Sequence, residues 1–209
     1  MLATLVLAQL LRDCASNVDP RTMAAIVRVE SGGNRLALHD NTADRSYAPA
    51  DAAEGAAWAS ELVAAGHNVD IGLSQINSAN LPRLGLTVAD AFEPCTNLRA
   101  GATILGGDYA AAAARFGPGQ VALRHALGAY NTGSLFAGGA YIDRILVAAG
   151  LAPEYGGDPA PPVAAAPRPA PPAPARTADP NAATAVVYGV KPAARRAPGS
   201  PVEIIIGNQ

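Results

Sequence analysis

The sequence has few charged residues, few cysteines and no long apolar run, and each shortage excludes a class of protein. Charged residues make up 15% of the 209 positions and give a net charge of −2, with both signs interspersed. This pattern argues against nucleic acid as a partner and against a basic membrane-binding surface. No segment approaches the ~20 apolar residues of a membrane-spanning helix, so no membrane span is expected.

Metal-binding and nucleotide-binding patterns are also missing. His39, His67 and His125 are scattered along the chain, and no Cys/His spacing resembles a ligand set. The sequence contains no GxGxxG, P-loop or GxSxG motif. We therefore expect no metal and no other cofactor. The only two cysteines, Cys14 and Cys95, form either a disulfide or a pair of buried free thiols, and the residues alone do not choose between these.

Proline is distributed so unevenly that it divides the chain in two. Of the 18 prolines, 13 follow Ala152. Residues 1–152 are long enough to bury a real core, and we expect a single domain there. Residues 153–209 are rich in proline and alanine, which predicts a disordered, polyproline-like tail without a core. Within this tail, residues 202–206 are either a strand that adds to a partner's sheet or only an apolar terminus.

The first eleven residues are apolar but carry no positive charge, and no good cleavage site follows them. Their apolar positions fit one face of a packed helix instead. An export signal is therefore not evident in this chain.

Most of the domain is predicted to be helical. Apolar residues at spacings of three and four predict a long central helix over 98–116, followed by helices over 121–131 and 139–149. A further helix is expected over 51–65, with Trp58 as a core residue. Residues 36–49 lack a helical repeat and predict a small irregular or β element, with a possible hairpin turn at 41–44. The fold class is therefore α-rich with a small β element.

Glu30 lies where a helix turns into a loop. Asp19 is a good N-cap, Pro20 suits the first helical position, and Gly32 follows the last turn. Glu30 thus falls at the negative end of the helix dipole beside packed apolar side chains, and both effects disfavour its charged form. A carboxyl group that stays protonated near neutral pH suits general-acid catalysis.

Two further stretches place polar side chains at turns: GLSQIN at residues 72–77 and AYNTG at residues 129–133. Their amides can donate to and accept from sugar hydroxyl or acetamido groups. The plainer interpretation is that the amides cap turns and that Tyr130 is a core aromatic residue.

Taken in order with Glu30-Ser31, these two stretches resemble the soluble lytic transglycosylase family, whose fold is related to goose-type lysozyme. The resemblance covers roughly residues 5–150. The family pattern has methionine where this chain has Ser74, and alanine where it has Thr132. Residues 58–80 look most like the subgroup that serves type IV secretion and conjugation systems.

The resemblance implies an α+β lysozyme-like domain that cleaves the β-1,4 bond between N-acetylmuramic acid and N-acetylglucosamine in peptidoglycan. Glu30 would protonate this bond and then deprotonate the C6 hydroxyl of the sugar, which gives a 1,6-anhydro product. In the family, the tyrosine matching Tyr130 reaches towards the catalytic carboxyl, and Tyr141 resembles a later cleft tyrosine. The substrate-binding residues expected on this basis are Ser31, Gln75, Asn77, Tyr130, Asn131 and Tyr141.

The resemblance also implies a periplasmic protein, which favours the Cys14–Cys95 disulfide. Its implied partners are peptidoglycan strands and, through the tail, components of a type IV secretion system. Two alternatives remain open at this point. One is a hydrolytic muramidase on the same fold, in which Asp70 or another loop acid orients water. The other is a catalytically silent peptidoglycan-binding scaffold of the secretion machine.

Overall fold

The computed structural model describes residues 4–156, so the predictions for the proline-rich tail and for residues 202–206 lie almost wholly outside the described chain. The described part confirms an α-rich domain with a small sheet. Its α-helices are α1 (Thr4–Cys14), α2 (Pro20–Glu30), α3 (Ala52–Ala64), α4 (Leu81–Leu84), α5 (Pro94–Phe116), α6 (Gln120–Thr132) and α7 (Gly139–Ala148). None of these helices has the length and apolar character needed to cross a membrane.

Side-chain caps mark the first residues of α2 and α3, and the cap of α2 is the one that the sequence predicted. The Asp19 side chain accepts a hydrogen bond from the Arg21 N–H at the start of α2, and Asp51 accepts one from the Glu54 N–H at the start of α3. Each of these bonds satisfies a backbone donor that has no partner within its helix. The boundaries of both helices are therefore fixed by residues next to them in the sequence.

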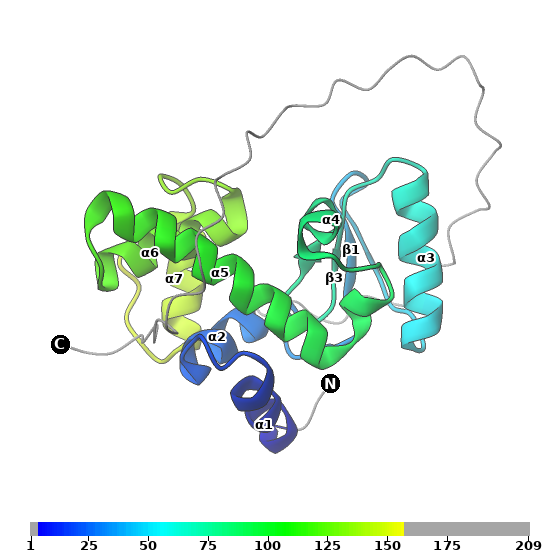
Figure 1. Ribbon diagram of the computed structural model, residues 1–209, viewed down its shortest axis with the longest axis horizontal. Coiled ribbons are helices and arrows are strands. Elements are labelled where there is room, and N and C mark those ends of the chain that lie inside the picture. The colour runs from blue at the N-terminus through cyan, green and yellow to red at the C-terminus, as the bar shows by residue number, and fades with distance from the viewer. Residues whose placement is uncertain (1–3, 157–209) are drawn as a thin grey trace, which may run out of the picture.

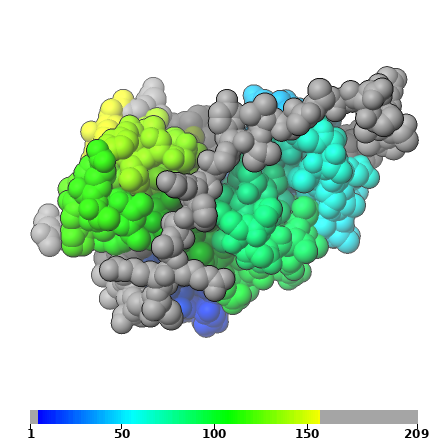
Figure 2. Space-filling view, turned by 45° about the horizontal axis from the view of Figure 1, so that its top comes forward, coloured from blue at the N-terminus to red at the C-terminus, as the bar shows by residue number. Residues whose placement is uncertain are grey.

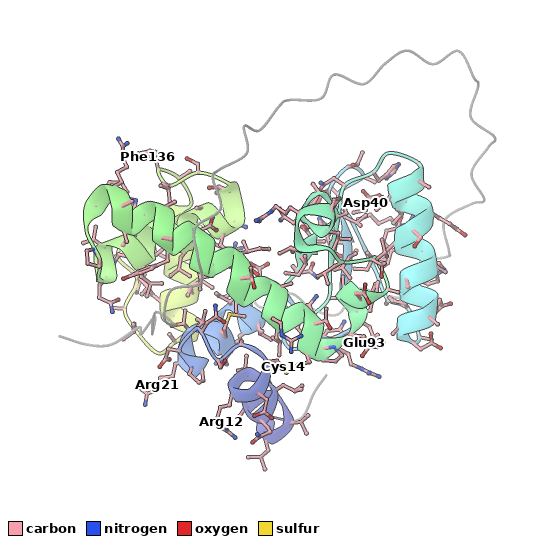
Figure 3. The ribbon with its side chains drawn as sticks, in the orientation of Figure 1. Arg12, Cys14, Arg21, Asp40, Glu93 and Phe136 are labelled. Carbon is pink, nitrogen blue, oxygen red and sulfur yellow. A yellow bond between two sulfur atoms is a disulfide. The ribbon has the colours of Figure 1, made fainter. Side chains whose placement is uncertain are left out.

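A four-stranded antiparallel sheet occupies the region where the hairpin was predicted. Its strands are β1 (Leu38–Asp40), β2 (Arg45–Tyr47), β3 (Val69–Ile71) and β4 (Ile76–Asn77), in the spatial order β2-β1-β3-β4. The predicted hairpin is β1-β2, in which Leu38 pairs with Tyr47. The buried Asp40 side chain, labelled in Figure 3, accepts hydrogen bonds from the Thr42 N–H and from His67 Nδ1. Strands β3 and β4 were missed because two or three residues are too short for an alternating pattern.

The described chain forms two lobes joined by α5, which runs from one lobe to the other in Figure 1. Helices α1, α2, α6 and α7 pack on one face of α5 around Leu98, Ala102 and Leu105. The sheet and α3 pack on another face, against Ala100 and Ile104. The predicted central helix is confirmed, and its two faces serve two separate cores.

A disulfide joins Cys14, at the end of α1, to Cys95, at the start of α5, with their Cα atoms 5.2 Å apart. The sulfur atoms lie beside the Cys14 label in Figure 3. The bond closes a loop with a sequence separation of 81 residues. It fixes the first helix to the helix that both lobes share.

The packed part of the chain continues past residue 152. The buried Asp143 carboxylate accepts hydrogen bonds from the Glu154 and Tyr155 N–H groups, at 2.6 and 2.9 Å. The Glu154 side chain forms an ion pair with Arg124 of α6. The domain therefore extends at least to Tyr155, three residues beyond the boundary expected from composition.

Candidate active site

A cleft of about 360 Å³ carries most of the polar residues that the sequence singled out. The two lobes appear in Figure 2 as a green-to-yellow surface from α5, α6 and α7 and a teal-to-cyan surface that includes α3. Residues of both lobes and of α5 line the cleft: Glu30, Asn41, Asn68, Asp70, Gln75, Asn77, Asn80, Arg83, Ile104, Asp108, Ala129, Tyr130, Asn131 and Gly133.

Glu30 is the last residue of α2, and the chain turns away directly after it. Gly33, at φ +79°, adopts the left-handed conformation that glycine favours. The Ser31 hydroxyl donates hydrogen bonds to the Leu73 carbonyl at 2.8 Å and to the Val27 carbonyl at 3.2 Å. Ser31 is not among the residues that line the cleft. These two bonds tie the 72–75 loop to the end of α2, and the expected contact of Ser31 with substrate stays a prediction.

The Glu30 carboxyl has an environment that favours its protonated form. Burial raises its pKa from 4.5 to about 7, and the negative charge of Asp70 adds to this rise. A hydrogen bond from Tyr141 and the charge of Arg144 act in the opposite direction. The predicted direction is confirmed, and burial is the main cause. At pH 7 the protonated fraction is roughly 10² times that of a glutamate with the ordinary value.

Tyr141 is the tyrosine that contacts the Glu30 carboxyl. Its hydroxyl donates to Glu30 Oε1 at 2.5 Å from α7, and its ring is buried with Arg144 over one face. Burial and the charge of Glu30 raise the Tyr141 pKa well above its ordinary value, so its hydroxyl remains a donor. This contact fixes the orientation of Glu30.

Tyr130 makes no hydrogen bond to Glu30 in the described chain, although the charge of Glu30 acts on it. Its hydroxyl donates to the Ser74 carbonyl at 2.8 Å, and its ring packs against both cores. Tyr130 thus holds the 72–75 loop against α6, and it also lines the cleft.

Asp70 lies in the same cleft and is held by side-chain amides. Its two carboxylate oxygens accept hydrogen bonds from Asn77 Nδ2 at 2.7 Å and from Asn41 Nδ2 at 2.8 Å. Asn68 connects the two asparagines by accepting from both. Asp70 lies in none of the sequence motifs, and only the pairing of β3 with β4 brings it beside Asn77.

Asn77 was expected to bind substrate through its amide, but most of that amide is used within the protein. Its oxygen accepts from the Ala79 N–H, which caps a 3-10 helix (Ser78–Asn80), and from Asn68 Nδ2. Its nitrogen donates to Asp70 and Asn68. Asn77 therefore lines the cleft mainly as the residue that orients Asp70. Asn131 also lines the cleft, at the exposed end of α6, and no hydrogen bond to its amide is seen within residues 4–156.

The 72–75 loop is held by a buried residue that sequence reasoning missed. Asn97 of α5 accepts from the Ser74 N–H and donates to the Ile71 and Ala91 carbonyls, at 2.7 to 2.8 Å. Gly72, at φ +77°, is required here because a Cβ would lie 2.4 Å from Asn97 Nδ2. The absence of a side chain at Gly72 therefore makes room for Asn97.

Gln75 follows in the same loop with φ +46°, which is rare for a residue other than glycine. Its Nε2 donates to the Gly72 carbonyl at 2.9 Å, and its amide oxygen has no hydrogen-bond partner in the described chain. The strained backbone therefore presents a free acceptor in the wall of the cleft.

Comparison with known proteins agrees with this geometry. The pattern of the Transglycosylase SLT domain matches residues 11–140, which is more than half of the chain. The chain belongs to the transglycosylase SLT family. No solved structure matches it significantly.

Several relatives of this SLT domain are virB1 proteins. The protein virB1 of Agrobacterium fabrum is 41% identical over 141 residues, which cover 66% of this chain and 57% of the relative. The type IV secretion system protein virB1 of Brucella abortus biovar 1 is 43% identical over 140 residues, with the same coverage. A virB1 protein of Rhizobium radiobacter is 39% identical over 140 residues. The match thus spans less than three-fifths of the length of each of these relatives.

The SLT domain departs from the family pattern at Ser74, and the structure shows the consequence. Ser74 is fully buried, and its hydroxyl has no hydrogen-bond partner within the described residues. A Cβ added to Gly101 of α5 would lie 2.8 Å from Ser74 Oγ, so the loop packs directly on the helix backbone. The loop is therefore positioned by its backbone and by Asn97, and the side chain at position 74 contributes little polar binding.

Proposed function

We propose that this SLT domain is a lytic transglycosylase that cleaves the β-1,4 bond between N-acetylmuramic acid and N-acetylglucosamine in peptidoglycan. The observation that carries the proposal is Glu30, a cleft carboxyl whose pKa is raised to about 7 mainly by burial. Glycosidic-bond cleavage needs an acid that still holds its proton at neutral pH.

In the first step, Glu30 gives its proton to the glycosidic oxygen, and the bond from that oxygen to C1 of the muramic acid breaks. The Glu30 carboxylate then takes the proton of the C6 hydroxyl, whose oxygen forms a bond to C1. The product is a 1,6-anhydro sugar, Glu30 is protonated again, and no water is consumed. The hydrogen bond from Tyr141 favours the carboxylate that forms in the first step, and it keeps Glu30 oriented in the second. Gln75 and Asn131 supply polar groups to the bound sugar.

A hydrolytic muramidase is the second candidate, and the position of Asp70 favours it. Asp70 lines the same cleft as Glu30 and is close enough for its charge to raise the Glu30 pKa. Two amide donors orient its carboxylate, as expected for a group that holds a water molecule or faces a cationic sugar. In this reaction water, rather than the C6 hydroxyl, would attack C1.

The cellular role that we propose is local opening of the cell wall for a type IV secretion or conjugation apparatus. Its support is the similarity to the type IV secretion system protein virB1 of Brucella abortus. Such a role places the domain in the periplasm, and the Cys14–Cys95 disulfide is compatible with an oxidising compartment. Contact with other components of the apparatus is assigned to the proline-rich residues after Gly156, on the basis of composition alone.

Digestion of purified peptidoglycan in water labelled with heavy oxygen tests the reaction. We expect anhydro-muropeptides that are lighter than the hydrolysed products by one water and that carry no label. Labelled reducing-end products would instead establish the muramidase. Glu30→Gln should release about 10² to 10⁴ times less product while still co-sedimenting with the insoluble wall. A Glu30→Gln protein that keeps the wild-type rate would refute both reactions.

A further inference from the structure

Part of the cleft takes no part in the proton transfers described above. It is lined by Asn80 and Arg83 from the sheet lobe, and by Ile104 and Asp108 of α5. Arg83 is the only cationic residue among those that line the cleft, which otherwise carries three carboxyl groups. An anionic substrate therefore meets one positive group in this site.

Arg83 is poised to bind an anion because most of its guanidinium is unused. Its Nε donates to Asn80 Oδ1 at 3.0 Å, three residues earlier in the same segment. Within residues 4–156 its two terminal nitrogens have no hydrogen bond or ion pair. A guanidinium held at Nε presents those two nitrogens as a fork, which matches the two oxygens of a carboxylate.

Asp108 lies near Arg83 without pairing with it. No ion pair within 4.0 Å joins the two side chains in the described chain, although the charge of Arg83 acts on Asp108. Burial raises the Asp108 pKa to about 6, and the charge of Arg83 partly opposes this. Two opposite charges thus line one cleft with a gap between them, which a ligand with an acceptor and a donor can fill.

Tyr130 connects this part of the cleft to the reaction centre. Burial raises its pKa well above the ordinary value, and the charges of both Glu30 and Asp108 raise it further. Tyr130 is therefore within electrostatic reach of both carboxyl groups, and it lines the cleft with them. A sugar bound beside Arg83 and Asp108 would be close to the bond that Glu30 protonates.

We propose that Arg83 is a specificity residue that binds a carboxylate on the muramic acid side of the substrate, and that Asp108 accepts a hydrogen bond from a hydroxyl or amide of the same unit. The carboxylate belongs either to the lactyl group of muramic acid or to the stem peptide attached to it. This inference rests on the proposed function, because it takes peptidoglycan as the substrate.

Three substrates separate the sources of the carboxylate. Intact glycan strands carry peptide carboxylates, amidase-stripped strands carry only the free lactyl carboxylate, and stripped strands coupled to methylamine carry neither. The variant is Arg83→Gln, and the matched control is Arg12→Gln. Arg12, labelled in Figure 3, lies on α1, which contributes no residue to the cleft. It likewise donates to an amide oxygen three residues earlier, that of Gln9. KM and kcat are measured for all three proteins on each substrate.

Arg83→Gln is expected to raise KM about tenfold on the charged strands, equivalent to about 1.4 kcal/mol, with kcat within a few-fold of wild type. On the neutral strands, wild type and variant should have the same KM. An effect on stripped strands identifies the lactyl carboxylate, whereas an effect on intact strands alone identifies the peptide. Equal rises on charged and neutral strands, or no rise on any strand, would overturn the proposal.

A binding measurement separates this inference from the proposed reaction. In the Glu30→Gln background, calorimetry is done with soluble intact fragments and with soluble stripped fragments. Adding Arg83→Gln should weaken the binding of at least one of these two charged fragments about tenfold, and should leave the binding of the methylamide fragments unchanged. Equal affinities for the charged fragments would refute the role of Arg83 even if the enzyme were active. The proposed reaction would fail separately, through its products.

Discussion

Replacing Glu30 by glutamine should change the stability of the domain relative to wild type, and this change should be more favourable at high pH than at low pH. The folded-state pKa of about 7 lies above the ordinary 4.5, so the folded protein binds this proton more tightly than the unfolded chain does. Wild-type stability should therefore fall as the pH rises from about 4.5 to 7, because folding then opposes ionisation. Glutamine does not titrate, and the variant avoids this loss.

The size of the effect follows from the same pKa. A rise in pKa from 4.5 to about 7 corresponds to at most about 3.5 kcal/mol, at about 1.4 kcal/mol per pKa unit. Glu30 is only partly buried and opens to the cleft, so solvent screening reduces this figure. We expect the free energy of unfolding of Glu30→Gln, relative to that of wild type, to increase by about 1 to 2 kcal/mol between pH 4.5 and pH 8.

Urea unfolding at pH 4.5 and pH 8 measures this gain, with a constant m-value as the check that unfolding remains two-state. Glu61→Gln is the matched control, because Glu61 is an exposed glutamate on α3. Its difference from wild type should not depend on pH. If the difference between Glu30→Gln and wild type were the same at both pH values, burial would not control Glu30, and the acid-catalysis argument would lose its basis.

Further predictions concern the surroundings of Glu30, the 72–75 loop and the end of the described chain. Tyr141→Phe removes a hydrogen bond that favours the Glu30 carboxylate, so the basic limb of the pH profile of kcat/KM should move to higher pH. Asp70→Asn removes a negative charge that opposes ionisation of Glu30, so the same limb should move to lower pH. Limbs that stay in place would contradict these contacts. Asn97→Ala removes three buried hydrogen bonds and should cost about 2 to 4 kcal/mol in urea unfolding, whereas a cost under about 0.5 kcal/mol would show that the loop is held otherwise. Ending the chain after Gly156 should leave activity within a few-fold, whereas ending it after Ala152 also removes the Glu154 contacts and should lower Tm.

Features that depend on neighbouring residues were predictable from the sequence. The helix α2 begins at Pro20 and ends at Glu30 because its cap, its apolar positions and its glycines all lie within one short segment. The raised pKa of Glu30 followed from the same segment, since burial at a helix end is a local consequence of the apolar pattern. The long helix α5 was equally clear from its periodicity.

Features that depend on the fold were not predictable in this way. Asn97 looks like an ordinary helix residue, and nothing local indicates that it binds a loop more than 20 positions earlier. Tyr141 meets Glu30 across a sequence separation of 111 residues, so the choice between it and Tyr130 needed the packing of α7 against α2. The strands β3 and β4 were not predicted from the sequence for a related reason. Each forms its backbone hydrogen bonds only with other segments of the sheet.

The charged residues of the cleft show why short sequence motifs do not predict substrate specificity. Three carboxyl groups line one cavity, and each has a different set of neighbours. Glu30 is partly buried and accepts a hydrogen bond from Tyr141, Asp70 accepts hydrogen bonds from two asparagines, and Asp108 lies near Arg83 without forming an ion pair with it. The role of each carboxyl group depends on its neighbours. For Glu30, the neighbours that disfavour its charge come from the same short segment, so the motif is enough to predict acid catalysis. The substrate group that the cleft selects depends instead on Arg83 and Asp108, which only α4 and α5 bring together.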